Sequence, residues 1–409
     1  MRISTQSFYE QSQTAMSSQQ GSLLRVQQQM GNMTRVLSPA DDPIGATRAL
    51  TVSQSIALHT QYAASRAQAT QTLSMEENAL QSVTSLLQDV KTMLIQAGNG
   101  TLSDADRSSI ATALQSQLNQ LQGLANSDDG NGQYLFAGFR SANPPFVTDP
   151  DGSIAYVGDQ GQRMVQVDVA RQMAASNDGR SIFQSVQSGA GYVSNAGSTN
   201  SGSGVFSAVT VADPTNADYG KDFSIRFTTD ATGTLQYQVD STDQPPISLV
   251  PPSRFVANQP ISFGGLQLSI SGTPDAGDTF DVKTAKNAGT SIFDAITDAI
   301  GALQQPLDNG NSSDRASLLN ALSTANRKVT NTHDNVLTVR ASVGSRLQEL
   351  DALNTTGSNR SLLDKTQLSD LQDLDYASAI SEFYQRQTAL EATQQVFVKI
   401  QKLSLFNYL

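Results

Sequence analysis

Large apolar side chains recur every seven residues near both ends of the chain, and this spacing limits the folds available to it. The amino-terminal set is Tyr9, Met16, Leu23, Met30 and Leu37. The carboxy-terminal set is Tyr376, Phe383, Leu390 and Phe397. A seven-residue apolar repeat is typical of a helix that packs along a partner helix. The two end helices can meet only if the chain doubles back, so the sequence predicts an antiparallel helical rod built from both ends.

The amino-terminal repeat ends at a turn that contains two prolines, residues 37–43. Each proline removes a backbone donor, and a serine or an aspartate in the turn can cap a new helix whose first turn accepts Pro43. Apolar residues at three-four spacing then continue to Ala97, where the glycines of residues 98–100 end the pattern. We therefore expect a long second helix from about Pro43 to Ala97.

A third helix is predicted to begin at Ser103, which can cap a first turn that contains two aspartates. Its apolar positions run to Ala125, and residues 128–130 (DDG) are predicted to end it. From about Gln133 to Asp281 the apolar period changes from 3.6 to 2, and Gly, Pro, Asp and Asn separate short alternating runs. The middle of the chain is therefore predicted to be an antiparallel β domain.

Two segments of this middle region are predicted to differ in order, one as a hairpin and one as a mobile loop. Residues 223–239 alternate apolar and polar side chains on either side of a DATG turn, which indicates a hairpin. Residues 188–204 are rich in Gly and Ser and poor in apolar side chains, so we expect a mobile loop there.

The helical period returns after Thr290 and continues to the carboxy terminus. The predicted fold is α+β, with a long antiparallel helical rod or coiled coil from both chain ends and an inserted antiparallel β domain. We expect terminal coiled-coil helices over residues 1–40 and 361–409, a helical rod domain over 41–142 and 284–360, and the β insert over 143–283.

Composition narrows the classes of function. The net charge is -11, and no cluster of Lys and Arg is present to neutralise phosphate, which argues against nucleic acid or an anionic membrane as a partner. No Cys is present, so disulfides and thiolate metal sites are excluded. The first residues lack the apolar stretch of a cleavable signal peptide, and no run approaches the about 18 apolar residues that cross a bilayer.

Candidate catalytic and metal-binding groups are few. His59 and His333 are the two histidines, and neither lies in a catalytic motif. We expect His59 to be packed or half-exposed and His333 to be solvated. Residues 127–132 (SDDGNG) lack the alternating oxygen ligands and the closing Glu of a calcium-binding EF-hand loop. We predict no catalysis, no metal and no cofactor.

Several motifs resemble those of the bacterial flagellin family. Residues 37–46 (LSPADDPIGA) resemble the family's turn between the first terminal helix and the rod, and residues 375–409 are similar to its last helix. Residues 132–138 (GQYLFAG) resemble the segment after the third rod helix in the hook-associated, hook-filament junction branch. Residues 270–282 (ISGTPDAGDTFDV) are similar to a strand-turn-strand of hook-associated proteins. The β insert itself matches no pattern.

The resemblance implies a structural axial subunit of the bacterial flagellum, with terminal helices in the inner axial region and an insert that faces outward. Such a subunit would self-associate into a ring between the hook-side junction protein and flagellin, and would provide the platform for filament growth. It would leave the cell by flagellar type III export, with an export chaperone on its carboxy-terminal region. The alternatives are flagellin, another secreted axial protein, or a surface adhesin that binds through the β insert.

The residues predicted to carry assembly lie on the apolar stripes of the two end helices, where each large buried side chain contributes roughly 1.5–3 kcal/mol. They are Leu23, Val26, Met30, Met33, Phe383, Leu390, Phe397 and Ile400. Gln19, Gln387 and Gln394 are predicted to occupy core positions between them. Because glutamines weaken an isolated two-helix seam, we expect both chain ends to be disordered in the free monomer.

Overall fold

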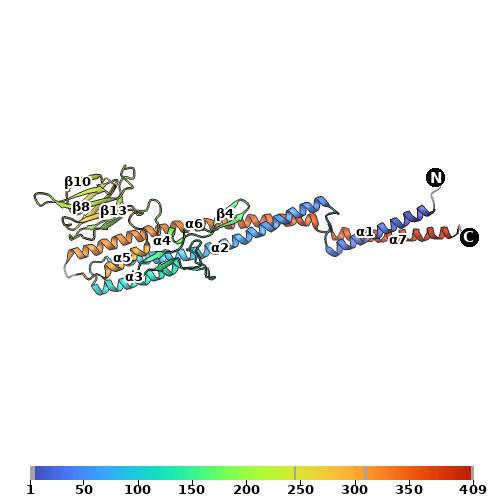
Figure 1. Cartoon of the computed structure of the whole chain (residues 1–409), viewed down its shortest axis with the longest axis horizontal. Coiled ribbons are helices and arrows are strands. Elements are labelled where there is room, and N and C mark those ends of the chain that lie inside the picture. The colour runs from blue at the N-terminus through green and yellow to red at the C-terminus, as the bar shows by residue number, and fades with distance from the viewer. Residues whose placement is uncertain (1–4, 244–245, 308–310, 407–409) are drawn as a thin grey trace. The chain divides into compact units, whose positions relative to one another are not determined.

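The structure is a computed structural model that describes residues 5–243, 246–307 and 311–406 (Figure 1). The side chains of Thr5, Gln6 and Phe8, and those from Ile400 onward, lie outside the described part. The chain divides into two compact units. Unit 1 comprises Met1–Ser65 and Ala352–Leu409, and unit 2 comprises Arg66–Asp351. Two long helices, α2 (Pro43–Ala97) and α6 (Ser312–Gln372), contribute residues to both units.

Unit 1 pairs the two end helices of the chain. These are α1 (Thr5–Asn32) and α7 (Tyr376–Phe406), which lie side by side (Figure 1). They run antiparallel, because Tyr9 contacts Phe397 at one end of the pair while Thr34 forms a bridge with Asp373 at the other. The predicted antiparallel pairing of the chain ends is confirmed.

The helices of unit 2 begin and end largely where the local signals predict. Besides its shares of α2 and α6, the unit contains α3 (Asp104–Ala125), the short α4 (Gly179–Phe183) and α5 (Ile292–Gln304). Ser103 caps α3, since its hydroxyl accepts a hydrogen bond from the Asp106 amide at 3.2 Å and its own amide donates to the Asp106 carboxylate at 3.0 Å. This reciprocal capping box fixes where the helix starts.

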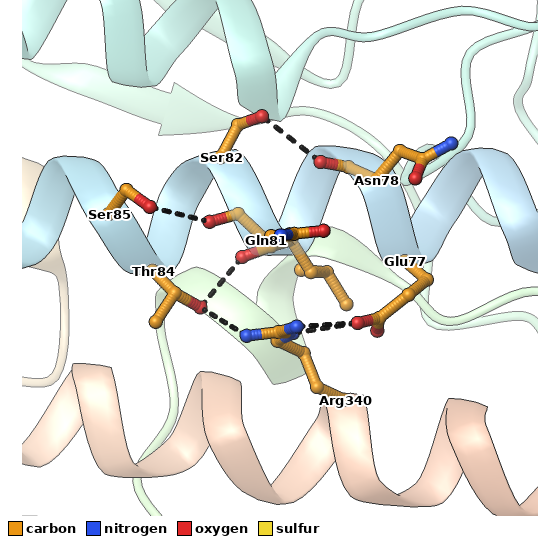
Figure 2. A network of polar contacts seen from close by, with 8 residues as sticks. Glu77, Asn78, Gln81, Ser82, Thr84, Ser85 and Arg340 are labelled. Atoms are coloured by element: carbon orange, nitrogen blue, oxygen red, sulfur yellow. Dashed lines mark hydrogen bonds and ion pairs between the residues drawn. The ribbon is translucent and has the colours of Figure 1, made fainter.

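Within unit 2, α2 and α6 are joined by one arginine (Figure 2). The Arg340 guanidinium on α6 donates to the Glu77 carboxylate on α2 at 2.6 and 3.0 Å. Its third nitrogen lies 3.3 Å from the hydroxyl of Thr84. One planar side chain therefore spans two turns of the facing helix and sets the register between the two helices.

Two small hairpins follow α3. They are β1 (Phe146–Thr148) with β2 (Ile154–Tyr156), and β3 (Met164–Asp168) with β4 (Arg171–Ala174). Four buried rings tie this region to the helices: Phe146 lies 5.0 Å from Phe293 of α5 and 5.4 Å from Phe183, and Phe136 lies 5.7 Å from Phe183 between ring centroids. The first part of the insert therefore shares its core with the helices.

The remainder of the insert is a β-sandwich in which every named strand pairing is antiparallel. One sheet has the order β10-β9-β8-β13-β5. Its strands are β5 (Val193–Ala196), β8 (Phe223–Thr229), β9 (Leu235–Ser241), β10 (Ser248–Arg254) and β13 (Thr279–Lys283). The other sheet has the order β11-β12-β6, with β7 also paired to β12. Its strands are β6 (Val205–Phe206), β7 (Thr210–Val211), β11 (Pro260–Phe263) and β12 (Leu266–Ser271).

The two sheets share one apolar core. Phe223 of β8 lies 5.1 Å from Phe263 of β11 between ring centroids, and Ile225 and Val239 are fully buried in the same cluster. The alternation of residues 223–239 thus predicted the hairpin correctly, because its apolar positions face the opposite sheet. The α+β fold with an inserted antiparallel β domain is confirmed.

The prediction of a mobile loop at residues 188–204 is wrong. This segment contains β5, and polar side chains of α6 hold its backbone: Asn331 donates to the Gly191 carbonyl at 2.8 Å, and the Thr324 hydroxyl donates to the Ser194 carbonyl at 2.7 Å. Asn320 donates to the Gly204 carbonyl at 2.9 Å and accepts from the amide of Phe206. Hydrogen bonds from a neighbouring helix replace the apolar packing that the segment lacks.

Helix boundaries near the chain ends differ in part from the expected ones. The helix α6 continues to Gln372, so the carboxy-terminal break in the helices lies at residues 373–375 and not at 361. On the amino-terminal side, α2 begins at Pro43 as predicted. The assignment of residues 1–40 and 361–409 to an inner axial region stays a prediction.

Candidate assembly interface of the terminal helices

The seam between α1 and α7 is built from the predicted heptad positions, yet it is only partly buried. Val26 is 4% exposed and Ala379 is 5% exposed, which makes them the two buried apolar residues among the described side chains of α1 and α7. The other large seam residues keep intermediate exposure. They are Leu23, Met30, Phe383, Leu390 and Phe397. Two helices alone therefore leave part of each apolar stripe accessible to a further partner.

Two of the predicted assembly residues, and one other heptad residue, differ from their expected setting or cannot be placed. Met33 follows the end of α1, adopts a φ of 56° and is 69% exposed, so it does not belong to the helical seam. Its left-handed backbone turns the chain away from the helix axis. The side chain of Ile400 lies outside the described residues. Tyr376 begins α7 with half of its surface exposed.

The polar positions of the seam also differ from expectation. Gln387 and Gln394 are exposed, while Arg386 and Thr393 are half-buried beside Ala379 on the paired face of α7. Gln19 is half-buried, as a core position would be. The residues of the Phe383 heptad from Phe383 onward are half-buried as expected. The second half-buried row of α7 contains Arg386 and Thr393, which lie one residue before the two glutamines. Small or polar side chains in this row limit the apolar area that the pair can bury by itself.

The two breaks in the helices lie next to each other at the base of the seam. The Arg35 amide donates to the Gln372 carbonyl at 2.8 Å, and the Leu374 amide donates to the Met33 carbonyl at 3.1 Å. The Arg35 guanidinium adds a bond to the Leu371 carbonyl at 3.0 Å. These bonds satisfy backbone groups that the two helix ends leave free, and they fix the register between the chain ends.

The turn between α1 and α2 is organised by two adjacent aspartates. Asp41 accepts hydrogen bonds from the amides of Leu37 and Ser38 and pairs with Arg25 of α1. The hydrogen bond from the Ser38 amide is the largest cause that lowers the pKa of Asp41 below its usual value, and the charge of Arg25 lowers it further, while burial acts in the opposite direction. The motif of this turn is visible in the sequence, but its pairing with Arg25 is not, because the two residues meet only when the turn closes.

Asp42 performs a different task in the same turn. Its carboxylate accepts a hydrogen bond from the Gly45 amide at 2.8 Å and so caps α2. A Cβ at Gly45 would lie 2.3 Å from a carboxylate oxygen of Asp42, so glycine is needed for this close approach. On the carboxy-terminal side, Asp375 caps α7 by accepting from the amides of Ala377 and Ser378. The starts of both helices are thus set by local carboxylates.

Large apolar side chains of unit 1 also lie in the open, outside the seam. They include Leu24, Ile44, Leu50, Leu58, Leu362, Leu363, Tyr384, Val396 and Val398. Exposed apolar surface of this kind is available for contacts with another protein. The terminal helices therefore offer apolar surface both within the seam and around it.

The described residues contain no group of three or more His, Asp or Glu side chains placed to hold a metal ion. None of the described helices combines the length and the hydropathy that crossing a membrane requires. His59 lies 3.5 Å from the carboxylate of Asp364 and is mostly buried, as expected for a packed helix position. His333 is also mostly buried, with 13% of its side chain exposed, so the expectation that it is solvated is wrong.

Comparison with known proteins agrees with this architecture. Residues 3–141 match the family described as the bacterial flagellin N-terminal helical region, and residues 326–409 match the bacterial flagellin C-terminal helical region. Flagellar hook-associated protein 3 of Salmonella typhimurium is 33% identical over 407 residues, covering 100% of this chain and 99% of that protein. The similarity therefore includes the β insert as well as the helical ends.

Two crystal structures have a similar fold. Flagellar hook-associated protein 3 of Legionella pneumophila has a TM-score of 0.71 at 26% identity, covering 78% of this chain and 98% of the solved chain. FlgL of Xanthomonas campestris has a TM-score of 0.68 at 27% identity, covering 78% and 99%. From the paired terminal helices, the inserted β domain and the similarity along the whole sequence, we conclude that this chain belongs to the bacterial flagellin family, in its group of hook-associated protein 3 proteins.

Proposed function

We propose that this chain is a structural axial subunit of the bacterial flagellum that joins hook to filament and gives flagellin a surface on which to assemble. The observation that carries the proposal is the half-buried seam of α1 and α7. Phe383, Leu390 and Phe397 keep accessible apolar surface in the pair, which a neighbouring subunit can cover. Similarity over the whole length to hook-associated protein 3 supports the same conclusion.

The proposed partners follow from this surface. Copies of the chain self-associate into a ring through the terminal helices, with a hook-side junction protein on one side and flagellin on the other. The β-sandwich of the insert faces outward, since the apolar cluster between its two sheets needs no cover from a neighbouring subunit. The subunit performs no catalysis and contributes only binding surfaces.

The proposed route to the site of assembly is type III export, which makes the protein secreted and extracellular. Before export, a chaperone covers the carboxy-terminal helix. An uncovered row of Phe and Leu side chains would otherwise self-associate inside the cell. The same face of α7 therefore has two successive partners, the chaperone and then the neighbouring subunits.

Electron microscopy of a strain that lacks this chain tests the proposal. We expect bare hooks, with flagellin released into the medium, because filament subunits have no surface on which to assemble. Normal filaments in the deletion strain would contradict a junction role. Loss of binding to host cells with unchanged filaments would instead favour an adhesin that acts through the β insert.

Expression of chain variants in the deletion strain tests the role of the carboxy-terminal seam. Wild-type chain should restore filaments. A chain with Phe383, Leu390 and Phe397 replaced by Ala should leave bare hooks. A control with Gln387 and Gln394 replaced by Ala should restore filaments, because both glutamines are exposed outside the α1–α7 seam.

A further inference from the structure

A carboxylic acid lies buried inside unit 2, away from the terminal helices. Glu76 on α2 is 1% exposed. Its carboxylate accepts a hydrogen bond from the side-chain amide of Asn177 at 2.5 Å. Asn177 belongs to the segment between β4 and α4, so this single contact connects α2 to a loop a hundred residues further along the chain. Carboxylic acids are seldom buried to this extent without a cationic partner.

The Asn177 side chain connects Glu76 to a cation on the facing helix. The Arg346 guanidinium on α6 donates to the Asn177 side-chain oxygen at 2.9 Å and to the Ala174 carbonyl at 3.0 Å. Among the described residues, Glu76 forms no ion pair of its own. The arrangement is therefore a three-part bridge, in which the amide of Asn177 separates the acid on α2 from the cation on α6.

The groups around Glu76 come from α2, from α6 and from the loop that contains Asn177. Glu77 is the residue that follows Glu76 on α2, and its carboxylate is paired with Arg340 of α6 at 2.6 Å (Figure 2). Arg346 approaches from α6, and the loop contributes Asn177. Burial is the main cause that raises the pKa of Glu76 to about 7, and the negative charge of Glu77 adds to it. The hydrogen bond from Asn177 and the charge of Arg346 act in the opposite direction.

We propose that Glu76 is a proton-dependent latch, which holds residues 174–178 between α2 and α6 when its carboxyl is neutral and loosens them when it ionises. A neutral carboxylic acid can be buried at modest cost once it accepts the hydrogen bond from the Asn177 side chain. An ionised acid at the same place lacks a direct cation, so the folded arrangement is penalised. The latch is independent of the proposed role in the flagellum, because it concerns only contacts within unit 2.

The direction of the pH effect follows from proton linkage. The ordinary pKa of a glutamate is 4.5 and that of Glu76 in the folded chain is about 7, so the folded state binds more protons than the unfolded state between these values. Stability of unit 2 therefore falls as the pH rises from about 4.5 to about 7, and levels off above that. The folding equilibrium constant is expected to fall on the order of 100-fold over this range from Glu76 alone.

Unfolding of the full chain between pH 5 and pH 8.5 tests the latch. We compare the wild type with Glu76→Gln, which keeps the shape and the hydrogen bond but cannot ionise. The wild type should lose stability as the pH rises, and the Glu76→Gln variant should lose far less. Glu77→Gln is the matched control: it removes a neighbouring carboxylate that is paired with Arg340 and should lower stability, while most of the wild-type slope with pH stays, because the charge of Glu77 is the last of the causes that shift the pKa of Glu76. A Glu76→Gln variant with the full wild-type slope would overturn the proposal.

A local readout keeps the test decisive if the Gln variant folds poorly. The amides of Ala175 and Gly179 are bonded to the carbonyls of Arg163 and Phe136 at 2.8 Å each, so their hydrogen exchange reports on the latched segment. After correction for intrinsic rates, their protection in the wild type should fall tenfold or more between pH 5.5 and pH 8. Amides of the β8–β9 hairpin should change little. Equal behaviour of both groups of amides would contradict a local latch.

Discussion

Val193 of β5 and Lys283 of β13 lie directly opposite each other as antiparallel partners. The chain therefore enters the β-sandwich and leaves it again at two residues that are neighbours in space. Antiparallel partners of this kind are about 5 Å apart, a distance that a two-residue turn can close. The two chain ends of the β-sandwich can for this reason be joined by a short turn, although the sequence limits of the sandwich do not coincide with those expected from the change of period.

The first prediction concerns the β-sandwich. Replacing residues 194–282 by Asn-Gly should leave the helices of unit 2 folded, since Phe146 and Phe183 remain packed on Phe293. The wider deletion of residues 143–283 removes both rings and should cost roughly 3–5 kcal/mol for each. Helical circular dichroism during urea unfolding compares the two. Equal stability of both deletions would show that the buried rings are not needed by the helices.

The second prediction concerns the carboxy-terminal seam. Replacing Phe383, Leu390 and Phe397 by Ala should weaken chaperone binding and junction assembly together, because one apolar face serves both partners. Melting of the β-sandwich should stay unchanged, since distant sites that share no contacts behave independently. Calorimetry measures the chaperone affinity and microscopy the filaments. The exposed pair Gln387→Ala and Gln394→Ala is the control, and an unaffected triple variant would contradict the assigned role of α7.

The third prediction concerns the polar stripe of α6. Asn320→Leu should lower the free energy of unfolding of unit 2 by about 1–3 kcal/mol, because the Phe206 amide and the Gly204 carbonyl both lose a buried partner. Ser323→Ala, at an exposed position one turn away, should change it by less than about 0.5 kcal/mol. Urea unfolding followed by fluorescence of the tyrosines measures both. Equal values for the two variants would refute a clamp at Asn320.

The fourth prediction concerns the turn between α1 and α2. The pKa of Asp41 is lowered in the folded chain, so its contribution to stability is present above the ordinary pKa of 3.8 and is lost as the pH falls through the lower folded value. Carbon-13 titration of the Asp41 carboxyl should give a midpoint below 3.8. In Asp41→Asn at neutral pH, the amides of Leu37 and Ser38 should exchange faster than in Asp149→Asn, which carries the same change in an exposed turn. An ordinary midpoint for Asp41 would exclude the proposed hydrogen bonds in solution.

The fifth prediction concerns the free monomer. Limited proteolysis should remove the segments of Met1–Ser65 and Ala352–Leu409 before it cuts Arg66–Asp351, because the α1–α7 seam buries few large side chains to offset the entropy of ordering two helices. Mass spectrometry of the fragments identifies the order of cleavage. An intact amino terminus after the β insert has been cut would reverse this ranking of local stability.

The sequence by itself determined the elements whose signals are local. The heptads of Leu23 and Phe383 indicated the end helices, Ser103 and Pro43 indicated where α3 and α2 begin, and the alternation around Phe223 indicated a hairpin. Each of these signals reflects a repeat or a cap within a few residues, where backbone geometry alone relates sequence to structure.

Only the tertiary structure decided which polar residues act at a distance. The order of residues 188–204 depends on side chains of α6 that lie more than a hundred positions later in the chain. The pairing of Arg25 with Asp41 requires a closed turn. Met33 is exposed because its own backbone adopts a left-handed conformation after the end of α1. The burial of Glu76 likewise depends on a loop that meets α2 only in the folded chain. No periodicity encodes such contacts, because a polar side chain has the same pattern in sequence whether water or a distant backbone group is its partner.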